Sequence, residues 1–151
     1  MVELNGTELT IEQVMAVARH KEQVRISEPA KQKIDRARAY VDEKLAQKAV
    51  IYGLTTGFGK FSDTFVPEQE TAALQRKLII SHACGMGAPL PCEVVRGAML
   101  LRCNALARGN SGIRLSTLET LLAMLNRGVH PVVPEKGSLG ASGDLAPLSH
   151  I

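Results

Sequence analysis

The sequence predicts a mainly α-helical protein with two glycine-rich loops. Several segments repeat apolar residues at helical spacing, and a Ser, Thr or Pro stands at the start of each, as is usual at helix N-termini. Glycines gather instead at 53–59 and 137–143, and stretches this rich in glycine interrupt regular helices and strands. We therefore expect a set of helices that positions two loops.

The chain is expected to begin with a short strand or arm over residues 4–9. Thr10 and Gln13 follow at the spacing of a capping box, in which each side chain binds a backbone N–H of the other residue. This pair predicts a helix over about residues 11–20. Its inward face is predicted to carry Ile11, Val14, Met15 and Val17.

A second start signal lies at Ser27, which is predicted to be an N-cap with Glu28 and Pro29 in the first helical turn. The helix should continue to about Gln47. Its apolar side chains form one stripe, with Ile34, Ala37, Tyr40, Val41 and Leu45. A short β-prone run follows at 49–52.

The middle of the chain carries two longer helical patterns. Pro67 predicts the start of a helix over about residues 67–82. A second helix, over about residues 91–108, is apolar on most sides, which predicts deep burial between other helices. Its arginines are expected to be paired or at the rim: Arg96, Arg102 and Arg108.

The last elements lead into the second glycine-rich loop. Ser116 is predicted to cap a helix that continues to about Asn126, and Gly128 is predicted to stop it. Residues 130–134 are expected to be extended. After the loop, Asp144 suits the N-cap or first turn of a further helix.

The composition fits one globular domain over residues 1–151. Hydrophobic residues make up 45%, charged residues 22%, and the net charge is +3. Basic residues are mixed with acidic ones and aromatics are only 3%, which argues against a nucleic-acid partner. No stretch approaches the roughly 20 apolar residues of a membrane span, so no membrane partner is expected. Cys84, Cys92 and Cys103 lack zinc-site spacing, and we expect reduced thiols in a cytoplasmic protein without a metal.

The first glycine-rich loop, Gly53-Leu54-Thr55-Thr56-Gly57-Phe58-Gly59-Lys60, fails the nucleotide-binding motifs. A phosphate-binding P-loop requires glycine at position 54 and Ser or Thr at position 61, where Leu54 and Phe61 stand. A dinucleotide fingerprint requires glycine at position 62, which is Ser62. The simplest interpretation of this stretch is a mobile glycine-rich loop without a binding role.

The second loop contains Ala141-Ser142-Gly143, a tripeptide that can react with itself. If the amide nitrogen of Gly143 attacks the carbonyl carbon of Ala141, a five-membered ring closes and the carbonyl oxygen leaves as water. Loss of the Ser142 hydroxyl as a second water then leaves an exocyclic methylene, and the surrounding structure has to hold the strain. An ordinary flexible loop is the alternative. A G-x-S-x-G nucleophile elbow is excluded, because Asp144 stands where the last glycine is required.

Two stretches resemble the aromatic amino-acid ammonia-lyases, the family of the histidine, phenylalanine and tyrosine enzymes. Residues 137–148 are similar to the signature around the family's reactive tripeptide, and residues 52–59 to its tyrosine loop, in the same order. The resemblance implies a mainly α fold: the N-terminal helical portion of the ammonia-lyase fold, in the fumarase/aspartase-like superfamily. Family members are several hundred residues long, so it also implies an N-terminal domain truncated after the Ala-Ser-Gly loop.

The resemblance implies chemical roles as well. The tripeptide 141–143 would form a methylidene-imidazolone ring, so that no external cofactor is needed. Tyr52 matches the family's catalytic base, which removes the β-proton of the amino-acid substrate; read alone, it is a half-buried aromatic at a strand end. His82 matches a position that contacts the substrate side chain, and Gly59 is assigned to substrate binding. The other histidines are expected to be structural or at the surface: His20, His130 and His150.

The implied activity is elimination of ammonia from L-histidine to give urocanate. Ser81-His82 is most like the histidine enzymes, whereas Thr55, where those enzymes more often carry Asn, favours the phenylalanine and tyrosine enzymes. A tyrosine or phenylalanine ammonia-lyase, an aminomutase with the same ring, and a non-catalytic helical interaction module are the alternatives. The family implies a homo-oligomer, a tetramer at full length. The isolated chain is expected to be inactive, because later sequence and neighbouring subunits would complete the site.

Overall fold

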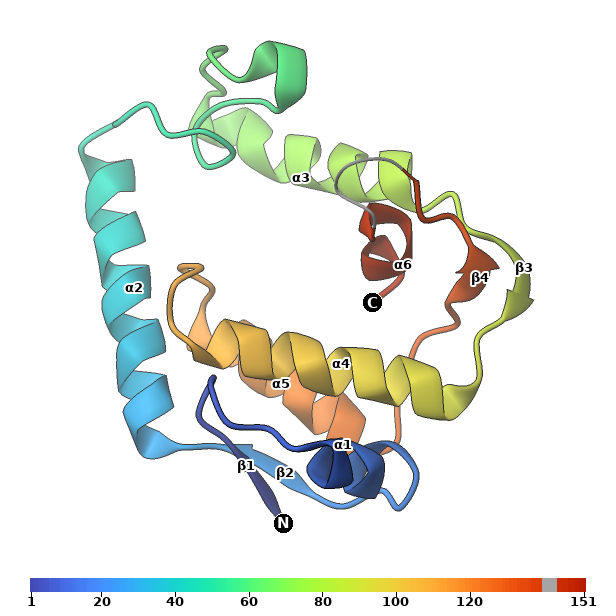
Figure 1. Cartoon of the computed structure of the whole chain (residues 1–151). Helices are drawn as coiled ribbons and strands as arrows, with labels where there is room; N and C mark the ends of the chain where they lie inside the picture. Colours follow the sequence, from blue (N-terminus) through green and yellow to red (C-terminus); the bar gives the residue numbers. More distant parts are fainter. Residues whose placement is uncertain (140–143) are drawn as a thin grey trace.

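The fold is mainly α-helical, as the sequence predicts (Figure 1). The computed structural model describes residues 1–139 and 144–151. Within them the helices are α1 (Ile11–Ala18), α2 (Glu28–Ala46), α3 (Glu68–His82), α4 (Cys92–Ala107), α5 (Leu115–Asn126) and α6 (Leu145–Ser149). The remaining elements are β1 (Val2–Leu4), β2 (Val24–Ile26), β3 (Met86–Pro89), β4 (Pro134–Lys136) and a 3-10 turn, η1 (Gly59–Phe61). No helix in the described part of the chain has both the length and the apolar character needed to cross a membrane.

The strands form two small sheets, β1 with β2 in parallel and β3 with β4 antiparallel. The sequence predicted a strand or arm over residues 4–9, whereas the strand occupies residues 2–4. The chain leaves the sheet at Asn5, because its Oδ1 accepts hydrogen bonds from the backbone N–H groups of Thr7 and Glu8, both at 2.9 Å.

Local start signals place α1 and α2 correctly. Thr10 Oγ1 accepts a hydrogen bond from the Gln13 N–H at 3.3 Å, and Gln13 Oε1 accepts one from the Thr10 N–H at 2.9 Å, which confirms the capping box. Ser27 Oγ accepts a hydrogen bond from the Ala30 N–H at 3.3 Å and caps α2. α3 likewise begins directly after Pro67, as predicted.

The inward faces of α1 and α2 are narrower than predicted. Val17 of α1 is buried, but Ile11 and Met15 are 75% and 41% exposed. In α2, Ile34 is buried whereas Tyr40 is 60% exposed. Figure 1 shows why: the C-terminal half of α2 leaves the core and leads to the loop that precedes α3.

The hydrophobic core lies between α1, α4, α5, the N-terminal half of α2 and the β1–β2 sheet. Its most enclosed apolar side chains are Leu4, Val17, Ile34, Met99, Leu100, Cys103, Leu118, Leu125 and Val133. α4 packs against α1 and α5. The prediction of deep burial holds only for the face of α4 that packs against α1 and α5. On its other side Val94 and Leu101 are 46% and 53% exposed.

Arg96 of α4 is buried in this core, with 2% of its surface exposed. Its guanidinium donates hydrogen bonds to the carbonyl oxygens of Val17 at 2.8 Å, Ala18 at 3.2 Å and Leu125 at 2.9 Å. These carbonyls belong to the last turns of α1 and α5, where helices have carbonyl groups without intrahelical partners and a partial negative charge. The sequence predicts that Arg96 is paired or lies at the rim of the core. Instead, Arg96 is inside the core, and main-chain carbonyl groups stabilise its charge.

The end of α5 is predicted better than its start. Ser116, predicted as the N-cap, lies inside the first turn. Gly128 stops the helix with a φ of 74°. Its N–H donates to the Leu125 carbonyl at 3.2 Å. The Val129 N–H donates to the Met124 carbonyl at 2.8 Å. The two bonds form a Schellman motif, whose left-handed residue is usually glycine.

Cys103 should resist alkylation while the chain is folded. Burial raises the pKa of its thiol to about 12, whereas Cys84 and Cys92 are exposed. Iodoacetamide reacts with the thiolate, so mass spectrometry after native labelling should find the label on Cys84 and Cys92. Cys103 should be labelled only after denaturation. Native labelling of Cys103 as fast as Cys84 would contradict the packing of α4 described above.

Candidate active site

Thr55 folds the segment that carries Tyr52. Its Oγ1 accepts a hydrogen bond from the Ile51 N–H at 2.8 Å and donates one to the Ala49 carbonyl at 2.7 Å. The Thr55 N–H also donates to the Ile51 carbonyl at 3.0 Å. The β-prone run at residues 49–52 therefore forms no strand, because these local bonds turn the chain instead of leaving it free to pair.

The rest of the loop closes on itself. Thr56 is 2% exposed, and its Oγ1 accepts a hydrogen bond from the Gly53 N–H at 3.1 Å. The Gly57 N–H donates to the Thr64 carbonyl at 3.1 Å, and Thr56 forms an isolated antiparallel bridge with Phe65. The loop before α3 is thus an ordered unit with its own hydrogen bonds.

Tyr52 and Gly59, both predicted as site residues, belong to this loop. Tyr52 is 64% exposed, and its ring meets the Phe58 ring edge to face, with the centroids 6.0 Å apart. Such contacts between aromatic rings fix their relative orientation. Gly59 has a φ of 56°, and no atom lies within 4 Å of the position of an added Cβ. Its requirement for glycine is therefore conformational.

His82, the third predicted residue, is the last residue of α3 and is half-buried. Its Nδ1 lies 2.8 Å from the Leu78 carbonyl oxygen. A carbonyl can only accept, so Nδ1 carries the proton, and Nε2 of the neutral ring is left with a lone pair. The Ser81 hydroxyl donates to the same carbonyl at 2.8 Å. These bonds hold the imidazole at the end of the helix.

We call the loop over residues 51–66 the Tyr52 loop. A cavity of about 380 Å³ lies between this loop and α3. Its lining comes from both sides: Gly57, Phe58, Phe61, Thr64, Val66, Leu74, Lys77, Leu78 and Ser81. Leu78 and Ser81 are the residues whose oxygens contact the His82 ring. The Tyr52 loop therefore lies against the turn of α3 that holds His82.

The base of the second glycine-rich loop meets the chain just after α3. The Gly85 N–H donates to Nε2 of His150 at 3.4 Å. A Cβ on Gly85 would lie 3.0 Å from both His150 Nε2 and the Pro134 side chain. A Cβ on Gly137 would lie 3.0 Å from the Ala146 Cβ. Contacts this short mean that a side chain at either glycine would require its neighbours to move.

The predicted ring residues, Ala141, Ser142 and Gly143, lie outside the described residues. On either side of them, the Ser138 hydroxyl donates to Asp144 Oδ1 at 3.4 Å. Asp144 takes the N-cap position of α6, as predicted, but its carboxylate makes no capping hydrogen bond. The described structure thus brings the Tyr52 loop and the base of the reactive loop to α3, whose last residue is His82.

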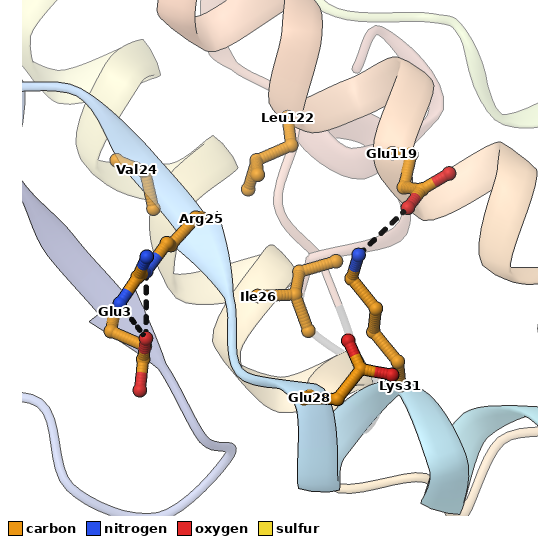
Figure 2. Close-up of a pocket in the computed structure, with 8 residues that line it drawn as sticks. All are labelled: Glu3, Val24, Arg25, Ile26, Glu28, Lys31, Glu119 and Leu122. Atoms are coloured by element: carbon orange, nitrogen blue, oxygen red, sulfur yellow. Dashed lines mark hydrogen bonds and ion pairs between the residues drawn. The ribbon is translucent and has the colours of Figure 1, made fainter.

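A second cavity, of about 440 Å³, lies beside the β1–β2 sheet, α2 and α5 (Figure 2). Four of the five charged residues that line it form ion pairs, Arg25 with Glu3 at 2.7 Å and Lys31 with Glu119 at 3.6 Å. None of its lining residues belongs to α3 or to either glycine-rich loop, so it is not the candidate active site. Within residues 1–139 and 144–151, no three His, Cys, Asp or Glu side chains are grouped to hold a metal ion.

The residues that hold Tyr52 in place were not identified from the sequence. Phe58 was not singled out, although an aromatic residue inside a glycine-rich loop was the available signal. The sequence pattern makes Thr55 an indicator of the substrate, yet Thr55 is 7% exposed and its hydroxyl binds Ala49 and Ile51. In this structure the Thr55 hydroxyl stabilises the loop conformation. Thr55 therefore gives no reason to prefer a phenylalanine or tyrosine substrate.

This helical fold is that of the ammonia-lyase and aminomutase enzymes. The solved ergothionase from Treponema denticola, an ergothioneine-degrading enzyme, matches with a TM-score of 0.92 and 36% identity over 99% of this chain and 30% of its own. Tyrosine aminomutase from Streptomyces globisporus matches with a TM-score of 0.88 and 35% identity over 99% of this chain and 28% of its own. The chain belongs to the aromatic amino acid lyase family, whose model matches residues 9–151.

Among curated relatives, the histidine ammonia-lyase of Alkaliphilus oremlandii is 59% identical over 148 residues, which are 98% of this chain and 29% of that enzyme. The chain therefore spans about 30% of the length of the curated relatives that it matches. The predicted family is confirmed.

Proposed function

We propose that this chain carries the catalytic tyrosine, a substrate-contacting histidine and the prosthetic tripeptide of a histidine ammonia-lyase, which converts L-histidine to urocanate and ammonia. The observation that carries the proposal is the meeting of three segments at α3. The Tyr52 loop shares a cavity with the turn that holds His82, and Gly137, at the base of the reactive loop, lies next to Gly85, just beyond that turn.

The chemistry requires removal of a weakly acidic β-proton and departure of an amine. The methylidene-imidazolone ring that we assign to Ala141, Ser142 and Gly143 would supply the electrophile for the amine. The described base of the loop fits such a ring, because a Cβ on Gly85 or Gly137 would lie only 3.0 Å from its neighbours, so both glycines allow close packing there. Tight packing of this kind is what strained backbone requires.

Tyr52 is the proposed base. Its exposed side chain, 64% accessible, is open to a substrate, and the edge-to-face contact with Phe58 orients the phenol ring. Gly59 shapes the same loop through its left-handed backbone. We assign it to substrate binding because the loop can then present main-chain atoms without a side chain in the way.

His82 is the proposed contact for the substrate side chain. Its Nδ1–H is held by the Leu78 carbonyl, so Nε2 can accept a hydrogen bond from the imidazole N–H of L-histidine. Curated histidine ammonia-lyases 51–59% identical to this chain support this substrate. A phenylalanine or tyrosine ammonia-lyase and an aminomutase are the alternatives within the same fold.

We further propose a cytoplasmic homotetramer. Association between chains is supported by the apolar surface of α3 and the Tyr52 loop, where Ile79, Ile80 and Phe61 are 54%, 59% and 61% exposed. Patches of this kind usually mark interfaces. The same surface favours a second candidate function, a helical module that binds a partner and performs no chemistry.

A chimera tests the proposal. This chain replaces the matching 29% of the Alkaliphilus enzyme, and product absorbance is followed with histidine, tyrosine and phenylalanine in turn. Mass spectrometry of the peptide with residues 141–143 should show the loss of two waters. Activity on histidine with the ring present supports the proposal, and a chimera with Ser142→Ala is the matched control. An assembled, folded chimera that retains both waters and is inactive would leave only the interaction module.

A further inference from the structure

His150 lies where three parts of the chain meet. It follows α6 directly, and its Nε2 accepts the hydrogen bond of the Gly85 N–H at 3.4 Å. Pro134, at the start of β4, lies against the same glycine. α6 packs beneath α3 in Figure 1, so this bond connects the helix after the reactive loop with the segment after α3.

The connection from Gly85 back to His82 is short and itself bonded. The Ala83 N–H donates to the Ile79 carbonyl at 2.9 Å, and the Cys84 N–H donates to the His82 carbonyl at 2.8 Å. A shift at Gly85 is therefore transmitted to His82 through three peptide units that have little freedom.

The connection from His150 to the reactive loop is equally direct. The His150 N–H donates to the Pro147 carbonyl at 3.2 Å, and the Leu148 N–H donates to the Asp144 carbonyl at 3.0 Å. Asp144 is adjacent in sequence to Gly143. The His150–Gly85 bond therefore sets where α6 begins relative to the end of α3.

We propose that His150 is a positioning residue for the lyase reaction: by accepting the Gly85 N–H, it fixes the exit of the 141–143 segment relative to His82. This inference rests on the proposed function. It replaces the sequence-based expectation that His150 is structural or at the surface. The required chemistry is an acceptor at the place of Nε2, which glutamine can supply through Oε1 and leucine cannot.

The test compares His150→Leu, His150→Gln and, as control, His20→Leu, which changes an exposed histidine. In the chimera, His150→Leu should lower kcat for L-histidine by about tenfold or more, since small misplacements of catalytic groups are costly. KM should change little, because His150 is not placed in contact with the substrate. His150→Gln should recover most of the rate and of the dehydrated 141–143 peptide, and His20→Leu should match the parent.

Hydrogen exchange on the 151-residue chain keeps the inference testable without activity. His150→Leu should speed exchange of the Gly85 amide and of α6, and His150→Gln should not. If Leu and Gln variants behave alike, in rate or in exchange, His150 is a packing residue and the inference is wrong. If the parent chimera forms no ring while the exchange pattern is as expected, the proposed function fails and the His150 anchor stands.

Discussion

Replacing Arg96 with methionine should lower the free energy of unfolding by about 3–5 kcal/mol, because three charge-assisted hydrogen bonds are lost at once. Methionine fills most of the space of the arginine stem, so the loss comes mainly from carbonyl groups. The carbonyls of Val17 and Ala18 would remain in the interior without a donor, whereas the Leu125 carbonyl would keep the Gly128 N–H. Buried acceptors without partners carry the full cost of their desolvation.

Urea unfolding followed by circular dichroism measures this loss. Arg102→Met, on the exposed side of the same helix, is the matched control and should change stability by less than about 0.5 kcal/mol. Arg96→Lys should fall between the two, because an ammonium cannot span carbonyls from two helices in a fork. It also provides a folded reference if Arg96→Met does not fold. Equal stability of the Arg96 and Arg102 variants would show that the carbonyl bonds contribute nothing.

The helices could be predicted because their signals are local. Thr10 and Ser27 bind N–H groups three residues away, and Gly128 ends α5 through bonds within the same turn. Such contacts depend on a few neighbouring residues that the sequence states directly. No distant segment has to be known in order to place them.

Arg96 could not be predicted in this way. Its partners lie in α1 and α5, and nothing in the sequence near it announces that two helix ends will meet there. The same limit applies to Ile11, which suits an inward position by spacing but is 75% exposed, because α1 presents only a narrow face to α4. Burial depends on which elements cover a face, and this is a property of the tertiary structure.

The candidate site shows the same difference between local sequence signals and tertiary packing. The two glycine-rich motifs identify Tyr52 and the 141–143 tripeptide as members of a pattern. Their supports, Phe58 beside the tyrosine and His150 beneath Gly85, become visible only when the chain is folded. Motifs identify reacting groups, whereas packing identifies the residues that orient them.

Tyr52→Phe in the chimera should lower kcat for L-histidine by at least about 100-fold, the smallest effect expected when a general base is removed. Phenylalanine keeps the ring that meets Phe58 edge to face, so the loop should retain its conformation. KM should change little, because the hydroxyl acts on the β-proton in the transition state rather than on the bound substrate.

The chain offers a matched control for this change, because its two tyrosines are Tyr40 and Tyr52. Tyr40 is similarly exposed, at 60% against 64%, but lies on α2 away from the glycine-rich loops. Tyr40→Phe should therefore leave kcat unchanged. If both variants retain the parent rate while the dehydrated 141–143 peptide is present, the ring is active and the proton is removed by another group. Loss of rate in Tyr52→Phe alone, with unchanged unfolding stability, assigns the base to the phenol oxygen.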